Sequence, residues 1–134
     1  MAHDFDELTR KFDASPFAAF LGMKLVELSD RYAKVAMVLR PEHRNFTGGV
    51  HGGLIMSLAD QAFACGTNTL DGLYVAIQFN INFFAVAADG ETIFAECRVM
   101  HGGKSIGVAE IVVADSRGRV LARATGTVAN VQRS

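Results

Sequence analysis

The stretch from Asn45 to Leu70 constrains this chain most, because its 26 residues include only one formally charged side chain, Asp60. The chain has 13 Lys and Arg and 14 Asp and Glu among 134 residues, so about five charges would be expected there by simple proportion. A helix with a broad solvent-exposed face would carry several of them. Burying one carboxylate is costly unless it is paired or hydrogen-bonded. The stretch therefore predicts a mostly buried helix in which Asp60 is a candidate for chemistry.

The rest of the sequence predicts short helices and strands around that central helix, which we place at about 52–68. A helix is predicted over 4–12, and Ser15-Pro16 begins a short helical turn that ends near Leu21. After Asp71-Gly72 the apolar residues recur with a period of two, which is typical of strands. The predicted strands cover 25–28, 33–39, 75–83, 92–99, 105–114 and 119–131.

These elements predict one α+β domain over 1–134, with 1–14 as an N-terminal helical extension. A chain of 134 residues has the usual size of one domain. Short turns between the last four strands indicate antiparallel neighbours. The long apolar helix must then lie against a curved antiparallel sheet of about six strands, because each element buries its apolar face against the other.

Composition argues against several classes of protein. The net charge is −1 and the positive residues form no run, which disfavours a nucleic-acid partner. No segment is apolar and long enough for a membrane span, and the acidic, polar N-terminus is not a secretory signal. Cys65 and Cys97 lack metal-ligand spacing and lie in apolar patterns, so we expect buried thiols in a reducing, cytoplasmic compartment. We expect neither a metal nor a cofactor.

The predicted central helix carries a narrow polar stripe. On a helical wheel, Ser57, Asp60, Gln61, Thr67 and Asn68 fall on one side. A solvated face is the ordinary explanation of such a pattern. Because this stripe is narrow and nearly uncharged, the pattern favours a helix face that lies on a cleft or against a partner subunit.

The helix start, His51-Gly52-Gly53, offers free backbone amides. The first amides of a helix lack internal acceptors, and the helix dipole favours negative charge there. Glycines let a ligand approach the backbone closely, so an oxyanion hole is one interpretation. Close packing of the helix on the sheet is the other, and the sequence leaves both open.

The spacing of Gly52 and Asp60 predicts a site shared between two chains. They are eight residues apart, which is roughly 12 Å along a helix, so both cannot contact one reacting carbonyl. If both act on the same carbon, they come from different subunits, and two antiparallel helices of a homodimer would form two identical sites. Uncharged polar residues of the next strand, Gln78, Asn80 and Asn82, suit such a surface.

The pattern Asn45-x-x-Gly48-x-x-His51-Gly52-Gly53, followed by Leu58-Ala59-Asp60 inside the helix, resembles the hotdog-fold acyl-CoA thioesterases. The nearest group is the phenylacetic-acid-degradation thioesterases and their relatives in the acyl-CoA thioesterase 13 family. The resemblance covers about 15–131, and the HGG and LAD motifs followed by four alternating strands make it fairly specific. It implies a helix wrapped by the sheet, and a homodimer joined edge to edge that we expect to pair into a homotetramer.

The resemblance also implies roles for individual residues. Asp60 would act as general base on water or, with less support, as a nucleophile that forms an anhydride. The Gly52 amide of the other subunit would polarise the thioester carbonyl, and Asn45 and His51 would orient water or substrate. The implied reaction is hydrolysis of an aryl- or medium-chain acyl-CoA to the free acid and coenzyme A.

Further residues are expected to contact substrate. The turn Gly102-Gly103-Lys104 matches the place where relatives hold coenzyme A. The expected substrate and coenzyme A contacts are Gly53, Gln61, Ala76, Gln78, Gly103, Lys104 and Ser105. Some relatives carry a serine on the strand after the helix, where this chain has Ala76, which puts a hydroxyl-assisted water and the acyl preference in doubt.

Two other functions stay open at this stage. A non-catalytic acyl-CoA binding module would share the fold without hydrolysing the thioester. A hotdog hydratase or dehydratase would use a His–carboxylate pair, which His51 and Asp60 could imitate. A serine-hydrolase site is disfavoured, because Ser57 does not lie in a G-x-S-x-G motif.

Overall fold

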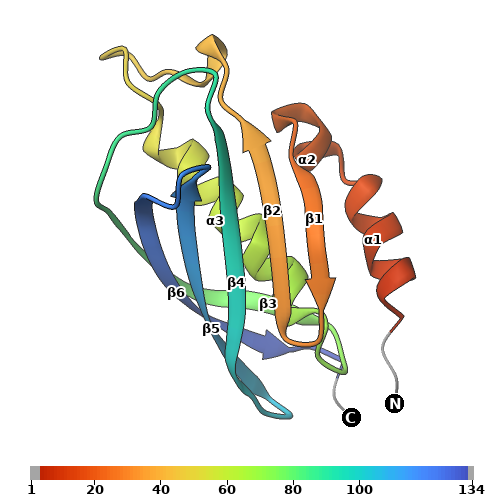
Figure 1. The fold of residues 1–134 in the computed structure, drawn as a ribbon. Coiled ribbons are helices and arrows are strands. Elements are labelled where there is room, and N and C mark those ends of the chain that lie inside the picture. The colour runs from red at the N-terminus through yellow and green to blue at the C-terminus, as the bar shows by residue number, and fades with distance from the viewer. Residues whose placement is uncertain (1–3, 133–134) are drawn as a thin grey trace.

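The structure, a computed structural model, describes residues 4–132 of the chain. Its helices are α1 (Phe5–Asp13), α2 (Pro16–Leu21), the 3-10 turn η1 (Pro41–His43) and α3 (Gly52–Thr67). Its strands are β1 (Lys24–Ser29), β2 (Tyr32–Val38), β3 (Tyr74–Phe83), β4 (Thr92–Gly102), β5 (Ile106–Asp115) and β6 (Val120–Asn130). The strands form one antiparallel sheet in the order β1-β2-β4-β5-β6-β3, which curves around α3 (Figure 1). The predicted fold class and element order are confirmed.

The short helices begin where the sequence predicts. Asp4 caps α1 by accepting a hydrogen bond from the Glu7 amide. Ser15 caps α2, and Pro16 is its first residue. The expected single domain over 1–134 and its extension over 1–14 include residues 1–3 and 133–134, which lie outside the described residues.

The apolar side of α3 packs closely on the sheet. Leu58, Ala59 and Ala62 are fully buried. A Cβ atom on Gly126 of β6 would lie 2.5 Å from the Phe63 ring, so only glycine admits that ring. The free thiols Cys65 and Cys97 are both buried, as predicted, and burial raises the pKa of each to about 12. The helix and the sheet therefore share one continuous core.

Strand β3 departs from the predicted simple alternation. Its pairing with β6 changes register between Ala76 and Gln78, so that Ile77 forms a bulge. Ala76 lies opposite the buried Val128, whereas Gln78 lies opposite Thr127, and adjacent residues of β6 point to opposite faces. The predicted period of two is therefore broken at Ile77, which is 57% exposed.

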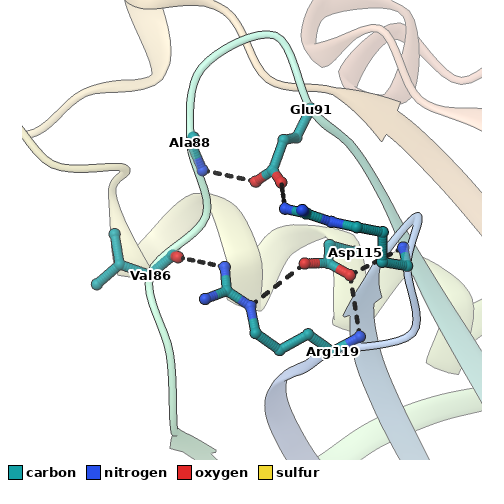
Figure 2. A network of polar contacts seen from close by, with 6 residues as sticks. Val86, Ala88, Glu91, Asp115 and Arg119 are labelled. Carbon is teal, nitrogen blue, oxygen red and sulfur yellow. Dashed lines mark hydrogen bonds and ion pairs between the residues drawn. The ribbon is translucent and has the colours of Figure 1, made fainter.

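A polar network supports the loop between β3 and β4 (Figure 2). The Asp115 carboxylate accepts hydrogen bonds from the Arg119 and Arg117 amides at 2.9 and 3.0 Å. The Arg119 guanidinium in turn donates to the Val86 carbonyl at 2.8 Å. Arg117 pairs with Glu91 across the same loop. The β5–β6 turn thereby fixes the loop between β3 and β4.

Candidate functional site

Asp60 lies midway along α3, on the side that the sheet does not cover. The single chain leaves Asp60 exposed, together with Met56 and Ala64 on the same side of the helix. The low-polarity environment that we expect around this carboxylate is therefore not completed within one subunit. Desolvation by the surrounding protein nevertheless raises the pKa of Asp60 above its ordinary value, and no charged or hydrogen-bonding neighbour in the described chain contributes to that shift.

The predicted polar stripe is only partly present. Ser57, Gln61 and Asn68 are half-buried on the uncovered side of α3. Thr67 is fully buried and donates its hydroxyl to the Phe63 carbonyl at 2.7 Å, because a threonine in a helix can satisfy its hydroxyl within the preceding turn. The uncovered side is thus less polar than the wheel predicted. Such a side is typical of a helix that faces a partner or a ligand.

The start of α3 has one free amide. The His51 ring caps the helix, with Nδ1 accepting from the Gly53 amide at 2.9 Å, and the His51 carbonyl accepts from Leu54 and Ile55. Among the described residues, the Gly52 amide alone in this first turn has no hydrogen bond. Histidine is not among the usual N-cap residues, so the sequence alone gives no signal for this cap.

Packing on the sheet does not explain both glycines. A Cβ atom on Gly53 would lie 3.0 Å from Nδ1 of His51, so glycine at this position admits the capping imidazole. A Cβ atom on Gly52 would lie 3.5 Å from the Phe83 ring, which is ordinary van der Waals contact. Glycine at Gly52 is therefore compatible with the approach of a ligand to its amide.

Asn45 shapes the loop before α3. Its Oδ1 accepts hydrogen bonds from the Thr47 amide, the Thr47 hydroxyl and the Gly49 amide at 2.9, 2.6 and 3.2 Å. These three donors fix the orientation of the side-chain amide, so Nδ2 is left as a donor. Among the described residues this group has no acceptor.

His43 is buried and supports the same loop. Its Nδ1 accepts from the Arg40 amide at 3.0 Å, and its carbonyl accepts from the His51 amide at 2.9 Å. Burial, and then the Arg40 charge, lower the pKa of His43. An Arg44–Asp89 ion pair joins this loop to the β3–β4 loop. Sequence reasoning missed His43 because its burial and its bond to His51 depend on how the loop folds, although its ring partner Arg40 is only three residues away.

The expected coenzyme A turn lies beyond the C-terminal end of α3. The Gly103 amide donates to Ile106 at 2.9 Å, and the Tyr74 hydroxyl donates to the Gly103 carbonyl at 3.0 Å. The side chain of Asn130 donates to the Lys104 carbonyl at 3.0 Å. The turn is therefore held rigidly, and the Lys104 side chain is exposed next to the half-buried Ser105.

The structure places some of the expected site residues on the α3 side of the sheet and others on the opposite face. Gln61 adjoins Asp60 on α3, and Ala76 lies on the helix-facing side of β3. Gln78 lies on the opposite face of the sheet, where Asn80 and Asn82 line a shallow polar pocket with Glu110 and Arg123. Within one chain Gln78 is therefore not brought to Asp60, because the bulge at Ile77 reverses the pattern.

One chain does not complete a catalytic arrangement. The donors of the loop and helix start lie at one end of α3, Asp60 lies at its middle and the rigid turn lies beyond its other end. Within residues 4–132, no group of three or more His, Cys, Asp or Glu side chains could hold a metal ion. The same range contains no helix that is long and apolar enough to cross a membrane.

Comparisons with known proteins agree on one family. The family described as Thioesterase superfamily matches residues 47–122. A putative esterase of Archaeoglobus fulgidus is 37% identical over 111 residues, which are 83% of this chain and 72% of that protein. The acyl-coenzyme A thioesterase PaaI of Escherichia coli is 31% identical over 105 residues, which are 78% of this chain and 75% of that protein.

Solved structures share the whole fold. The Escherichia coli PaaI protein from the phenylacetic acid degradation operon superposes with a TM-score of 0.91 at 26% identity, over 97% of this chain and 94% of that chain. A variant of the phenylacetic acid degradation protein PaaI from Thermus thermophilus gives 0.83 at 31% identity, over 87% and 100% of the two chains. The chain therefore belongs to the thioesterase superfamily, as a thioester hydrolase with a PaaI-like hotdog fold.

Proposed function

We propose that this chain is an acyl-CoA thioesterase whose active site is completed between two subunits of a homodimer. The observation that carries the proposal is the pair of unsatisfied groups on α3, the Gly52 amide and the Asp60 carboxylate. Eight residues separate them, or roughly 12 Å along the helix. Asp60 of one subunit and the partner's Gly52 can meet at one thioester if two α3 helices run antiparallel.

The two groups supply what thioester hydrolysis needs. The Gly52 amide donates a hydrogen bond to the carbonyl oxygen as it gains negative charge, an effect typically worth about 10²–10³ in rate. Asp60 takes a proton from water, whose oxygen attacks the carbonyl carbon, and general-base help is typically worth about 10²–10⁴. The C–S bond then breaks, the coenzyme A thiolate leaves and is protonated, and the free acid is released.

The environment of Asp60 suits this role. Desolvation raises its pKa, and a carboxylate with a raised pKa is a stronger base. The same group could instead attack the carbonyl carbon and form an anhydride that water hydrolyses. A single turnover in heavy-oxygen water separates the two routes, because only the anhydride route can leave the label in Asp60.

The loop before α3 adds two more donors. When the His51 ring is neutral, its proton is on Nε2, because Nδ1 accepts from Gly53 and a neutral imidazole has one donor and one acceptor. Asn45 offers Nδ2 as a donor, because its Oδ1 already accepts three hydrogen bonds. We assign these two groups to orienting the substrate carbonyl or the attacking water.

The acyl group is assigned as aryl or medium-chain. The half-exposed Phe83 ring lies against Gly52, which places an apolar surface beside the proposed oxyanion donor. The relative from Escherichia coli comes from a phenylacetic acid degradation operon, which supports an aryl group. Ala76 offers no hydroxyl to hold a water, so water activation rests on Asp60.

The edge strand β3 supports pairing of two copies through that strand. Its ten residues, Tyr74–Phe83, carry no charge, and within the described chain β6 is the only strand paired with it. The other edge, β1, is shorter, carries Lys24 and Glu27, and lies beside α1 (Figure 1). A long uncharged edge strand is a template for another strand. We therefore place the dimer contact at β3, and we retain a dimer of dimers in the cytoplasm as the expected assembly.

The test is the variant Asp60→Asn, assayed by thiol release from aryl and aliphatic acyl-CoA substrates. We expect kcat to fall on the order of 10²-fold or more. The melting temperature at neutral pH should stay equal or rise, because an unpaired, partly desolvated charge is removed. Asp13→Asn, which changes an exposed carboxylate in α1, is the matched control.

Three outcomes would contradict the proposal. Unchanged turnover in Asp60→Asn would remove Asp60 from the chemistry. Wild-type protein that binds acyl-CoA without releasing thiol from any substrate would indicate a binding module. Hydration of crotonyl-CoA in place of thiol release would indicate a hydratase.

A further inference from the structure

Arg31 has a backbone conformation that is unusual for its residue type. It lies in the two-residue turn between β1 and β2, with φ at 61°. Among residues 4–132 it is the only residue other than glycine with positive φ. Glycine, asparagine and aspartate are the residues that commonly occupy this region. A strained residue held by its surroundings motivates a functional hypothesis.

Two distant segments hold Arg31 in this conformation. Its amide donates to the Thr69 hydroxyl at 2.9 Å, and its carbonyl accepts from the Val99 amide at 3.0 Å. The Thr69 hydroxyl is itself anchored, because it donates to the Gly66 carbonyl of α3 at 2.7 Å. The backbone of Arg31 is therefore fixed by the end of α3 and by β4.

The Arg31 side chain lies against the rigid turn that follows β4. A Cβ atom on Gly102 would be 3.0 Å from a terminal guanidinium nitrogen of Arg31 and 2.7 Å from Leu70. Glycine at this position therefore lets the guanidinium approach the backbone. The next glycine, Gly103, is approached in the same way by Nε2 of His101. We call the site that Arg31 and Lys104 form at this turn the cationic turn.

The two permanent charges of the cationic turn have no anionic partner within the described chain. The arginines of the outer sheet face are paired, Arg98 with Glu96 and Arg123 with Glu110. Arg31 and Lys104 form none of the seven ion pairs of the described residues. Asp30 lies in the same turn as Arg31, and Asp71 lies between α3 and β3, yet neither forms an ion pair with Arg31 or Lys104.

We propose that Arg31, together with Lys104, binds the phosphate groups of the coenzyme A thioester. This inference rests on the proposed function, since it concerns the nucleotide end of the same substrate. A guanidinium binds phosphate through two parallel hydrogen bonds, and the backbone of Arg31 needs no ordering on binding because it is already held. Asp60 lies seven residues before the end of α3 at Thr67, roughly 10 Å, and the extended pantetheine arm separates the thioester from the diphosphate.

The test compares wild type with Arg31→Gly on three thioesters of the same acid. Glycine adopts positive φ freely, so this variant removes the guanidinium without demanding a new backbone. We expect KM for the acyl-CoA to rise about tenfold, as for the loss of one charge-assisted hydrogen bond. KM for the acyl-N-acetylcysteamine thioester, which has no phosphate, and kcat for both should be unchanged. The acyl-dephospho-CoA shows whether the diphosphate alone accounts for the effect.

Controls separate binding from structure. Arg31→Asn also tolerates positive φ and should repeat the rise in KM, whereas Arg31→Lys should recover part of the affinity. Arg10→Ala removes another exposed arginine, on α1, and should leave all constants unchanged. The melting temperature of Arg31→Gly should equal or exceed that of wild type, because strain is released.

The failure of this inference is distinguishable from the failure of the proposed function. An unchanged KM for acyl-CoA in an Arg31→Gly enzyme that still hydrolyses it would overturn the phosphate assignment alone. An equal rise for the N-acetylcysteamine thioester would also overturn it, as a general structural effect. If the wild-type protein hydrolyses no thioester, the Kd for coenzyme A, measured by calorimetry in both proteins, still tests the phosphate assignment. A tenfold weaker Kd in Arg31→Gly supports the phosphate site, and an equal Kd overturns it.

Discussion

At the scale of single residues, Asp60 and Gly52 share a property that most polar groups in this chain lack. Each is left without a hydrogen-bond partner in the described part of the chain, although nearby groups such as the Gly53 amide are satisfied. Unsatisfied polar groups cost free energy when water is excluded. The presence of two such groups on one helix supports the proposal that both take part in the reaction.

Replacing Gly52 by proline tests the amide alone. Proline is favoured at the first position of a helix, and His51 already has φ −66° and ψ 126°, a conformation that a residue before proline accepts. We expect α3 to persist while kcat falls about 10²–10³-fold, because the donor is removed. Circular dichroism checks the helix, and thiol release measures kcat.

The matched control for this variant is Gly52→Ala, which keeps the amide. Its methyl group would meet the Phe83 ring at an ordinary distance, so the fold should be undisturbed. Equal losses of kcat in Gly52→Ala and Gly52→Pro would show that shape at this position matters and that the amide does not.

At the scale of elements, the loops that carry the site are fixed by contacts from other parts of the sheet. Asp89 of the β3–β4 loop pairs with Arg44 beside the Asn45 loop. The β5–β6 turn holds the same β3–β4 loop through Arg119 (Figure 2). A series of contacts therefore links the loop before α3 to the carboxylate of Asp115, which lies at the end of β5.

The variant Asp115→Asn tests this support through its pH dependence. Hydrogen bonds from the Arg119 amide, and then from the Arg117 amide, lower the pKa of Asp115 below its model-compound value of 3.8. A lowered folded-state pKa gives stability that is present above the unfolded-state value and is lost as the pH falls through the folded-state value. We expect the variant to melt a few degrees below wild type at about pH 7.

The difference between the two proteins should shrink as the pH falls below 3.8 and through the lowered pKa, because wild-type Asp115 then becomes neutral. Melting curves of both proteins across this range provide the measurement. A constant difference at every pH would mean that the charge of Asp115 contributes nothing, and Asp13→Asn is the control for a surface carboxylate.

At the scale of the whole molecule, the single subunit has an open helix side and an open sheet edge, and both point to a second copy. The uncovered side of α3 carries Asp60 and the exposed Met56. The uncharged edge strand β3 has one hydrogen-bonded neighbour. A two-fold interface uses the same patch on both subunits, so one contact would complete two sites.

Mixed dimers of Asp60→Asn and Gly52→Pro test this sharing directly. Each variant alone should be nearly inactive. In a mixed dimer one site has an intact Asp60 and an intact Gly52, while the other site has neither. Random mixing by joint refolding should therefore restore about a quarter of wild-type activity, by the symmetry of a two-fold dimer. Wild-type protein refolded alone provides the scale, and no recovery on mixing would place both groups of a site in one subunit.

Local pattern was enough to predict the elements and the central helix. Apolar residues spaced for a helix or a strand must be buried whatever their partners are. The sequence alone therefore predicts α3, the strands and the buried thiols at Cys65 and Cys97. The motifs around His51 and Asp60 likewise indicated the family, because their residue types and spacing lie within one short segment.

Tertiary structure alone decided the remaining features, because each depends on residues far apart in sequence. Pairing with β6 creates the bulge at Ile77 that turns Gln78 away from α3. The curvature of the sheet leaves Asp60 on an uncovered side of the helix. The approach of Arg31 to Gly102 joins two turns that are distant in the chain. Periodicity shows which residues need burial, but strand register and side-chain contacts are settled only when distant segments pack together.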